Sequence, residues 1–173
     1  TMVRFHEDYK KYNKRFVAGP PGSGKSVGSV IELLAIAMRQ EPTPDGIRPT
    51  KFGIIRSTYG RLDRTSLVTL KTWLPAKHTK ITYSKPIKVH SRIPLPDNTI
   101  ADIQIELIAI ENARVLTVLD SYEATAIWLN EMIELPEGLV GKAGESVGRY
   151  PPSVMWDDDK SHVTKTLDRK SGS

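Results

Sequence analysis

Cysteine is absent from the 173-residue sequence, and no apolar run in it approaches the length of a membrane span. Without cysteine the chain can form neither a disulfide nor a thiolate zinc site, which fits a reducing cytosol. A spanning helix needs about 18 consecutive apolar residues, and no charged-then-apolar leader opens the chain, so we expect no membrane segment. The four histidines lie far apart in the sequence and lack the spacing of a metal site, so we expect them to be surface or structural residues. They are His6, His78, His90 and His162.

Acidic residues are scarce between Arg56 and Arg92, where nine lysines and arginines accompany Asp63 alone. From Asp97 to Glu137 the balance inverts, with nine acids against Arg114. This distribution predicts two electrical faces, of which the basic one suits phosphate contacts with a nucleic acid that carry little sequence information. A solvated surface that keeps the domain soluble is the alternative.

One stretch fits the phosphate-binding pattern G-x-x-x-x-G-K-[ST] at every fixed position. Its residues are Gly19, Pro20, Pro21, Gly22, Ser23, Gly24, Lys25 and Ser26. Glycines let consecutive backbone N–H groups turn toward phosphate oxygens, and the following helix adds the positive end of its dipole. We therefore expect Lys25 to reach the β- and γ-phosphates of ATP and the Ser26 hydroxyl to hold Mg²⁺.

The flanking segments predict the context that such a loop requires. Phe16-Val17-Ala18 indicates the end of a short buried strand before the loop. After it, apolar residues recur at three- and four-residue steps and predict one apolar helical face from about Lys25 to Arg39. The residues of that face are Val27, Val30, Ile31, Leu34, Ala35 and Met38. This context argues against a chance match by a loop rich in glycine and proline.

The rest of the chain favours one α/β domain, because 39% hydrophobic residues can build one sizeable core. A strand over 51–56 precedes a helix from Leu62 to Trp73, and Ile81 to Ile110 alternates as an antiparallel hairpin or added edge. A short helix is expected from Glu111 to Leu119, and then a central parallel strand over 124–129, buried on both faces. The predicted fold is a P-loop NTPase with a mainly parallel sheet, helices on both faces and an antiparallel addition.

Asn130 and Glu131 follow that last strand, where P-loop ATPases place an acidic pair. Glu131 is the candidate for polarising the attacking water. Asn130 departs from the general pattern, because its amide brings no negative charge, although it can accept a hydrogen bond from a water on Mg²⁺. A polar strand end without a catalytic role is the alternative.

An arginine finger is the remaining catalytic part, and it is worth about 10³ to 10⁵ in rate. The loop from Pro20 to Ser23 holds no arginine, so the finger would come from elsewhere in the chain or from a neighbouring subunit. Arg149 and Arg56 are the candidates, with Arg114 behind them. A structural role in its Gly/Pro turn is the alternative for Arg149. If the finger acts between subunits, a monomer should hydrolyse ATP slowly.

Together these motifs resemble the ATPase domain of tailed-phage terminase large subunits over about residues 5 to 152. The resemblance is carried by the P-loop, by Arg56-Ser57-Thr58-Tyr59 with Thr72-Trp73 in the next helix, by Trp128-Leu129-Asn130-Glu131, and by Gly148-Arg149-Tyr150-Pro151-Pro152. In that family an Asn-Glu or Asp-Glu pair closes the Walker B strand. The resemblance implies a RecA-like (ASCE) ATPase that packages double-stranded DNA into a procapsid in the host cytoplasm. It further implies a homo-oligomeric ring, monomeric in isolation, that meets the portal protein and the small terminase subunit.

The resemblance divides the chain into an ATPase domain over 1–152 and a polar tail or truncated end over 153–173. No nuclease domain is expected in this chain, and no motif that couples hydrolysis to movement is evident. Asp157-Asp158-Asp159 is expected to be solvated and not a metal site. Two other functions stay open, a helicase- or recombinase-like ATPase stimulated by DNA and a non-catalytic module in which ATP gates ring assembly. A small-molecule kinase is disfavoured, because no lid arginines follow the P-loop.

Overall fold

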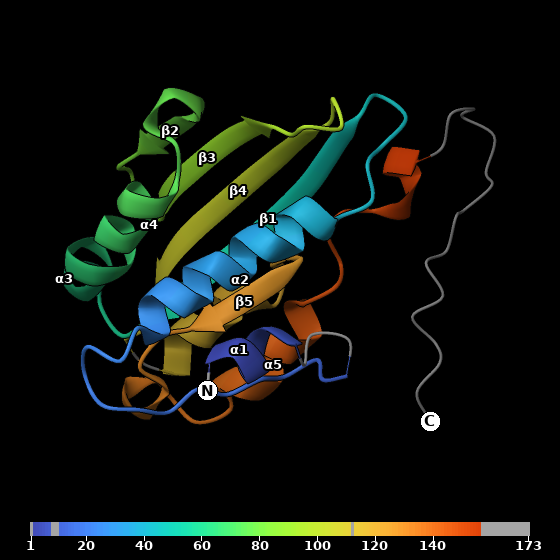
Figure 1. Ribbon diagram of the computed structural model, residues 1–173. Coiled ribbons are helices and arrows are strands. Elements are labelled where there is room, and N and C mark those ends of the chain that lie inside the picture. The colour runs from blue at the N-terminus through green and yellow to red at the C-terminus, as the bar shows by residue number, and fades with distance from the viewer. Residues whose placement is uncertain (1, 8–10, 112, 157–173) are drawn as a thin grey trace.

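The computed structural model describes residues 2–7, 11–111 and 113–156 (Figure 1), so the aspartate run and most of the predicted polar tail lie outside the described residues. The elements, in chain order, are α1 (Met2–Glu7), α2 (Lys25–Arg39), β1 (Ile47–Arg56), α3 (Tyr59–Arg61), the π-helix η2 (Leu62–Leu67), α4 (Val68–Trp73), η3 (Ala76–His78), β2 (Thr79–Thr82), β3 (Ile87–Pro94), β4 (Ile100–Ala109), η4 (Ala113–Leu119), β5 (Ala126–Leu129), η5 (Met132–Glu134), α5 (Leu139–Ser146) and η6 (Ser153–Trp156). Within these residues no helix is long and apolar enough to cross a membrane.

The sheet is mixed, with the strand order β2-β3-β4-β1-β5. β1 runs parallel to both β4 and β5, whereas β2, β3 and β4 pair antiparallel. The antiparallel addition is therefore confirmed, and β4 joins it to the parallel part. The sheet is an even mixture of the two pairings and not mainly parallel, because β4 belongs to both ladders.

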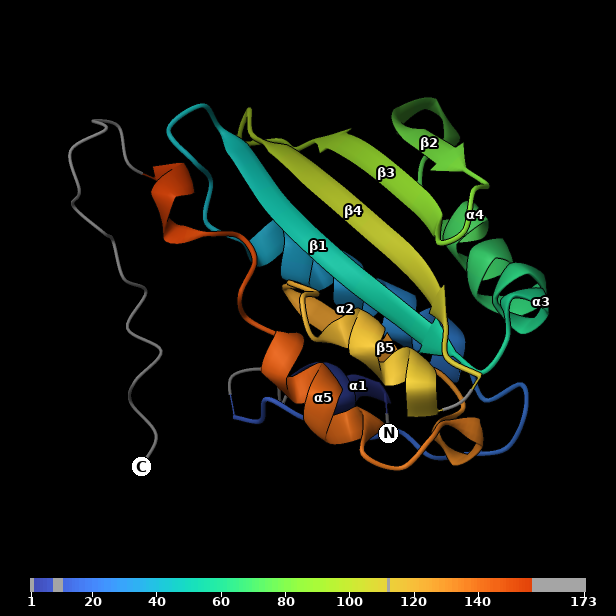
Figure 2. The same ribbon diagram turned by 180° about the vertical axis from the view of Figure 1, so that it is seen from behind.

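Helices cover the two faces of the sheet unequally. α2 and the helix formed by α3, η2 and α4 lie over one face (Figure 1), where Phe52, Leu62 and Ile105 belong to the larger buried cluster. On the other face a smaller cluster gathers around Ile55 and Leu119 near α5, while β3 and the adjoining part of β4 are seen uncovered (Figure 2). Helices on both faces were predicted, and the part of the sheet nearest β5 carries them on both.

The uncovered part of the sheet shows that charge does not separate into two faces there. The Nζ atom of Lys88 on β3 lies 3.8 Å from Glu106 on β4, and Asp102 on β4 lies 2.5 Å from His90 and 4.0 Å from Arg92. The sequence prediction of two electrical faces is wrong for these strands. Residues from the basic and the acidic stretch become cross-strand neighbours, because β3 and β4 pair antiparallel.

Two strand predictions are corrected. The segment from Phe16 to Ala18 forms no strand, and the Phe16 side chain is 67% exposed. β5 is an edge strand and not a central one, and its four residues are only partly buried. Apart from a single bridge between Ala124 and Val147, no strand of the described chain pairs with the outer side of β5. The segment before the P-loop therefore does not extend the sheet beyond β5.

The bounds of α2 match the prediction, but its buried face is turned relative to the predicted one. Val30, Leu33 and Ala37 are buried, whereas Ile31 and Met38 are 37% and 46% exposed. This buried stripe follows the i, i+3, i+7 steps that face the sheet. The prediction missed the orientation, because apolar residues occur on more than one side of α2.

A buried carboxylate on α2 anchors the segment that leads into the P-loop. The Glu32 side chain is 4% exposed. Its Oε1 lies 2.9 Å from Arg15 Nη2 and 3.2 Å from Arg39 Nη2, and its Oε2 lies 2.5 Å from His6 Nδ1. Arg15 also donates to the Phe5 carbonyl oxygen at 2.7 Å. Polar contacts of these side chains with Glu32 and with the Phe5 carbonyl oxygen, and not sheet hydrogen bonds, therefore hold α1 and the segment before the loop against α2.

We expect Glu32→Ala to lower the free energy of unfolding by about 3 kcal/mol, because removing one partner of a buried ion pair leaves the others uncompensated. Urea titration followed by circular dichroism would measure the loss. Glu41→Ala is the matched control, because Glu41 is an exposed acid just after α2, and it should change stability by less than about 0.5 kcal/mol. Equal effects of the two substitutions would contradict the anchoring role of Glu32.

Candidate nucleotide-binding site

The P-loop has the backbone that its glycines predict. Gly22 and Gly24 have φ angles of 76° and 78°, in the left-handed region that side chains other than glycine rarely adopt. Gly24 caps α2, and its carbonyl oxygen accepts the first helical hydrogen bond from Gly28 at 2.8 Å. The loop therefore ends at the N-terminus of a 15-residue helix, where unpaired N–H groups and the helix dipole favour an anion.

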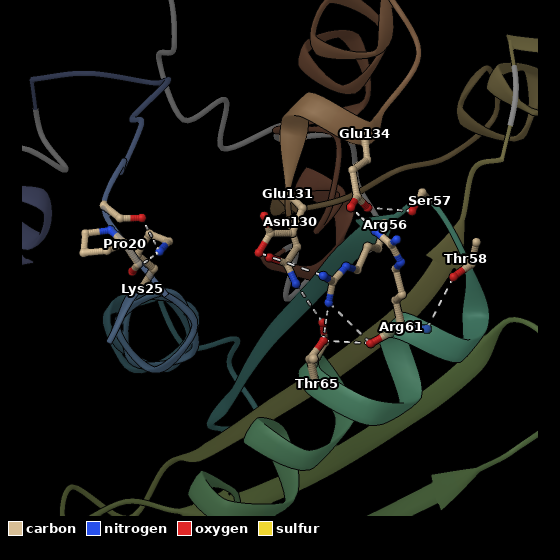
Figure 3. A network of polar contacts seen from close by, with 12 residues as sticks. Pro20, Lys25, Arg56, Ser57, Thr58, Arg61, Thr65, Asn130, Glu131 and Glu134 are labelled. Atoms are coloured by element: carbon tan, nitrogen blue, oxygen red, sulfur yellow. Dashed lines mark hydrogen bonds and ion pairs between the residues drawn. The ribbon is translucent and has the colours of Figure 1, made fainter. Parts of the chain in front are cut away.

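Lys25 folds back over the loop (Figure 3). Its Nζ donates to the carbonyl oxygens of Gly19 at 2.7 Å and Pro20 at 2.8 Å, and it lies 3.4 Å from Ser23 Oγ. A Cβ atom at Gly19 would meet Ser23 Oγ at 3.0 Å, so the loop closes tightly at this glycine. The ammonium is held by neutral oxygens, and an anionic phosphate oxygen is a stronger acceptor than either carbonyl.

Asn130 and Glu131 follow β5 directly, at the carboxyl end of the strand. Asn130 is 7% exposed, its N–H donates to the Ile55 carbonyl oxygen at 2.9 Å, and its Nδ2 donates to Ser66 Oγ at 3.1 Å. Glu131 has a φ of 57°, unusual for a residue other than glycine, and its side chain is 48% exposed. The turn after β5 thus buries the amide and leaves the carboxylate accessible to solvent.

Arg56 joins this pair from the end of β1. Parallel pairing sets Ile55 opposite Leu129, so the residues that follow the two strands meet at one edge of the sheet. Arg56 Nη2 lies 3.9 Å from Glu131 Oε1, and Nη1 donates to Thr65 Oγ1 at 2.5 Å. The Arg56 side chain is 11% exposed, and its Nε is buried without a partner in the described part of the chain. The guanidinium is therefore held in place beside the carboxylate.

Thr65 and Ser66, which contact Arg56 and Asn130, were not identified from the sequence. Both lie in η2, the π-helical part of the helix that follows β1. π segments are rare and often occur at functional sites. No local pattern marks one, so only the closeness of this helix to the ends of β1 and β5 could have revealed their role.

A second polar cluster ties η5 to α3. Glu134 forms an ion pair with Arg61 and accepts a hydrogen bond from Ser57 Oγ at 2.9 Å (Figure 3). Thr58 Oγ1 caps α3 by accepting from the Arg61 N–H at 3.4 Å. The loop that carries Glu131 is thus fastened to the start of the helix that also holds Arg56.

The other arginine candidates are not brought into this cluster. Arg149 is exposed beyond the end of α5, and within the described residues no hydrogen bond or ion pair holds its side chain. The Arg114 side chain lies outside what the structure describes. Of the sequence candidates, Arg56, Asn130 and Glu131 therefore come together at the ends of β1 and β5.

Neither a protein-family model nor a curated protein matches the sequence. Among solved structures, the large terminase from a thermophilic bacteriophage, in its second crystal form, matches 85% of this chain with a TM-score of 0.59 and 14% identity. This chain has the large-terminase fold. Terminase structures from the same phage in complex with ATP-gamma-S and with ADP match 77% and 75% of the chain, with TM-scores of 0.51 and 0.52 at 16% and 15% identity.

At these identities the likeness establishes the fold alone, and it confirms the fold that the motifs had indicated. The match covers 35% of the first terminase chain, so the present chain spans about a third of that protein. In the present chain the P-loop precedes α2, Arg56 is the last residue of β1, and the Asn-Glu pair follows β5.

Proposed function

We propose that this chain, over residues 1–152, is the ATPase motor domain of a terminase large subunit that drives double-stranded DNA into a procapsid. The observation that carries the proposal is the meeting of Asn130 and Glu131 with Arg56 at the carboxyl ends of parallel strands, in a chain that also has a complete P-loop. Figure 3 draws Lys25 at the start of α2, and it draws Asn130, Glu131 and Arg56 together near the ends of β5 and β1.

We propose that the triphosphate of ATP binds to the P-loop. The loop N–H groups and the N-terminus of α2 would receive the β- and γ-phosphates, and Lys25 would exchange its two carbonyl acceptors for phosphate oxygens. Binding of ATP is consistent with the terminase structures solved with ATP-gamma-S and with ADP.

Mg²⁺ fits the residues present. Mg²⁺ prefers oxygen donors and keeps several of its waters, so a hydroxyl and an amide oxygen suffice when phosphates supply the charge. Ser26 would hold the ion directly, and Asn130 would hold it through a water. When bound, the ion neutralises charge on the phosphates.

Glu131 is proposed as the general base that orients and polarises the attacking water. Its carboxylate is accessible, and the Arg56 guanidinium 3.9 Å away can fix its position. Because Arg56 is buried and bonded to Thr65, it suits this positioning role better than that of a finger that reaches a neighbouring subunit. The exposed Arg149 remains the candidate for the finger.

DNA is proposed to meet a smaller basic surface than the sequence had suggested. Some basic side chains between Arg56 and Arg92 already face a carboxylate within the chain, because Arg61 pairs with Glu134 and Lys88 with Glu106. The lysines and arginines of that stretch that are exposed and form no ion pair with a described residue lie on the helix after β1 and around β2, and we call this set the helix-hairpin surface. Its residues are Arg64, Lys71, Lys77, Lys80 and Lys85.

The helix-hairpin surface combines positive charge with two tyrosine rings, one exposed and one partly buried. Tyr83 is 59% exposed beside Lys71, and a hydrogen bond with Tyr83 raises the Lys71 pKa, so the ammonium stays charged. Lys85 Nζ lies 5.0 Å from the centre of the Tyr59 ring. Such a surface suits a phosphate backbone that is contacted without reading bases.

The test is steady-state ATP hydrolysis by this chain over a series of protein concentrations, with and without long duplex DNA. We expect turnover per chain to rise with protein concentration, because a ring supplies the finger between subunits, and to rise further with duplex. Lys71→Gln with Lys85→Gln should remove much of the DNA stimulation, leave the basal rate unchanged, and reduce the slope of log affinity against log salt by about 1.8.

The control for this experiment is Lys88→Gln with Arg92→Gln, which removes the same charge from residues that pair with acids of β4. It should leave DNA stimulation within about twofold of the unmodified chain, because the carboxylates beside these charges offset their attraction for a phosphate backbone. Stronger stimulation by single-stranded than by duplex DNA would instead favour a helicase-like ATPase. ATP binding without turnover at any concentration would favour the nucleotide-gated assembly module.

In the packaging proposal the working form is a homo-oligomeric ring at the portal of a procapsid, in the host cytoplasm. The portal protein and the small terminase subunit are its proposed partners. These assignments rest on the family resemblance of the motifs and on the shared fold.

A further inference from the structure

The Thr65 hydroxyl, on an exposed residue of η2, has a fixed polarity. Its Oγ1 donates to the Arg61 carbonyl oxygen, one helical turn earlier, at 2.7 Å. That bond uses the one proton of the hydroxyl, and two lone pairs are left to accept. A guanidinium can only donate, so Arg56 Nη1 donates to Thr65 Oγ1, at 2.5 Å. Thr65 therefore presents a lone pair, and not a proton, to Arg56.

The Arg56 guanidinium does not satisfy its own donors where it lies. Its Nη1 bonds with Thr65 and is 3.5 Å from the Arg61 carbonyl oxygen, and its Nη2 lies 3.9 Å from Glu131 Oε1 (Figure 3). Its Nε is buried without a partner in the described chain. A buried donor without a partner costs free energy and calls for an explanation. The place of the guanidinium is explained by the carboxylate that Nη2 faces.

The contact between Arg56 and Glu131 depends on where the guanidinium is held. At 3.9 Å the two groups attract each other as charges, but they are too far apart for a hydrogen bond. The Glu131 side chain is 48% exposed, so water competes with Arg56 for its carboxylate. No hydrogen bond between the two fixes their distance, so the contact requires that another residue keep Arg56 in place.

We propose that Thr65 is a positioning residue, whose hydroxyl holds Arg56 so that Nη2 faces Glu131 and keeps that carboxylate where it can polarise water. The inference rests on the proposed function, because it takes Glu131 as the general base. Thr65 acts only through Arg56, since its own side-chain hydrogen bonds in the described chain go to Arg56 and to the Arg61 carbonyl oxygen.

Thr65→Val and Thr65→Ser separate the hydroxyl from the shape of the side chain. Valine keeps the shape and lacks the hydroxyl, whereas serine keeps the hydroxyl and lacks the methyl group. The measurement is ATP hydrolysis over a range of ATP concentrations, at a protein concentration where turnover per chain no longer rises. Thr65→Val should lower kcat about tenfold and leave KM within about twofold, because it removes a hydrogen bond to a charged group away from the P-loop. Thr65→Ser should keep kcat within about twofold of the unmodified chain.

Thr72→Val is the matched control on the same helix. Thr72 is also exposed, and its Oγ1 donates to the Val68 carbonyl oxygen at 3.0 Å, one turn earlier, as Thr65 does to Arg61. It bonds to no side chain of the site in the described chain, so kcat and KM should stay within about twofold. In an Arg56→Met background, Thr65→Val should change kcat by less than about twofold, because no guanidinium is left to hold.

The outcomes separate a positioning role from simple packing. Normal kcat in Thr65→Val, or an effect on KM alone, would overturn the inference. A loss with serine as large as the loss with valine would overturn it too, because packing and not the hydroxyl would then matter. An undiminished effect of Thr65→Val in the Arg56→Met background would show that Thr65 does not act through Arg56. Absence of turnover in the unmodified chain, or normal turnover by Glu131→Gln, would overturn the proposed function itself and this inference with it.

Discussion

Lys25→Ala is expected to weaken ATP binding by at least about 100-fold and to abolish measurable turnover. The Lys25 ammonium donates to two carbonyl oxygens of the P-loop at 2.7 and 2.8 Å, so it lies where a phosphate bound by the loop would meet it. Two hydrogen bonds to a charged group, each worth about 1.5 to 3 kcal/mol, account for a loss of this size. Equilibrium binding of a fluorescent ATP analogue, with and without Mg²⁺, would measure it.

This substitution should damage binding and not folding. Lys25 is the first residue of α2, and alanine is the strongest helix former, so thermal unfolding should shift by only a few degrees. Lys142→Ala is the control, because that lysine pairs with Asp120 away from the loop and should leave the affinity unchanged. ATP affinity that survives Lys25→Ala would show that the loop is not the phosphate site.

Glu131→Gln is expected to leave ATP bound while lowering turnover by about 10² to 10⁴. Glutamine keeps the size of the side chain and requires the same backbone, with a φ of 57° at this position. It removes the negative charge that Arg56 faces at 3.9 Å and that a general base needs to polarise water. Single-turnover hydrolysis measured beside equilibrium ATP binding would separate the two effects.

The matched control is Glu134→Gln, which changes a carboxylate three residues along in η5. Glu134 pairs with Arg61 and Ser57, so its loss should loosen the loop but keep turnover within about tenfold of the unmodified chain. Normal hydrolysis by Glu131→Gln would assign the base to another residue. If Glu131→Gln lost ATP binding as Lys25→Ala is expected to, its effect would lie in the fold and not in the chemistry.

The amino-acid sequence alone determined those parts of the protein that depend on neighbours within a few residues. The P-loop followed from its pattern, and the left-handed φ angles of Gly22 and Gly24 explain why glycine stands there. The bounds of α2 and the C-terminal end of the helix after β1 followed from local patterns, whereas that helix begins at Tyr59 and not at the predicted Leu62. The Asn-Glu pair followed from its place after an apolar run of strand length.

Tertiary structure decided what depends on residues far apart in the chain. The register of β1 against β5 brings Arg56 to Glu131, and packing of η2 brings Ser66 to Asn130 across 64 positions. Pairing of β3 with β4 neutralises charges that the sequence had set apart. The position of β5 at the edge of the sheet also depends on tertiary structure, because it is set by which strands pair with one another. Local patterns select an element and its faces, but only the folded sheet and the helices packed on it determine which elements become neighbours.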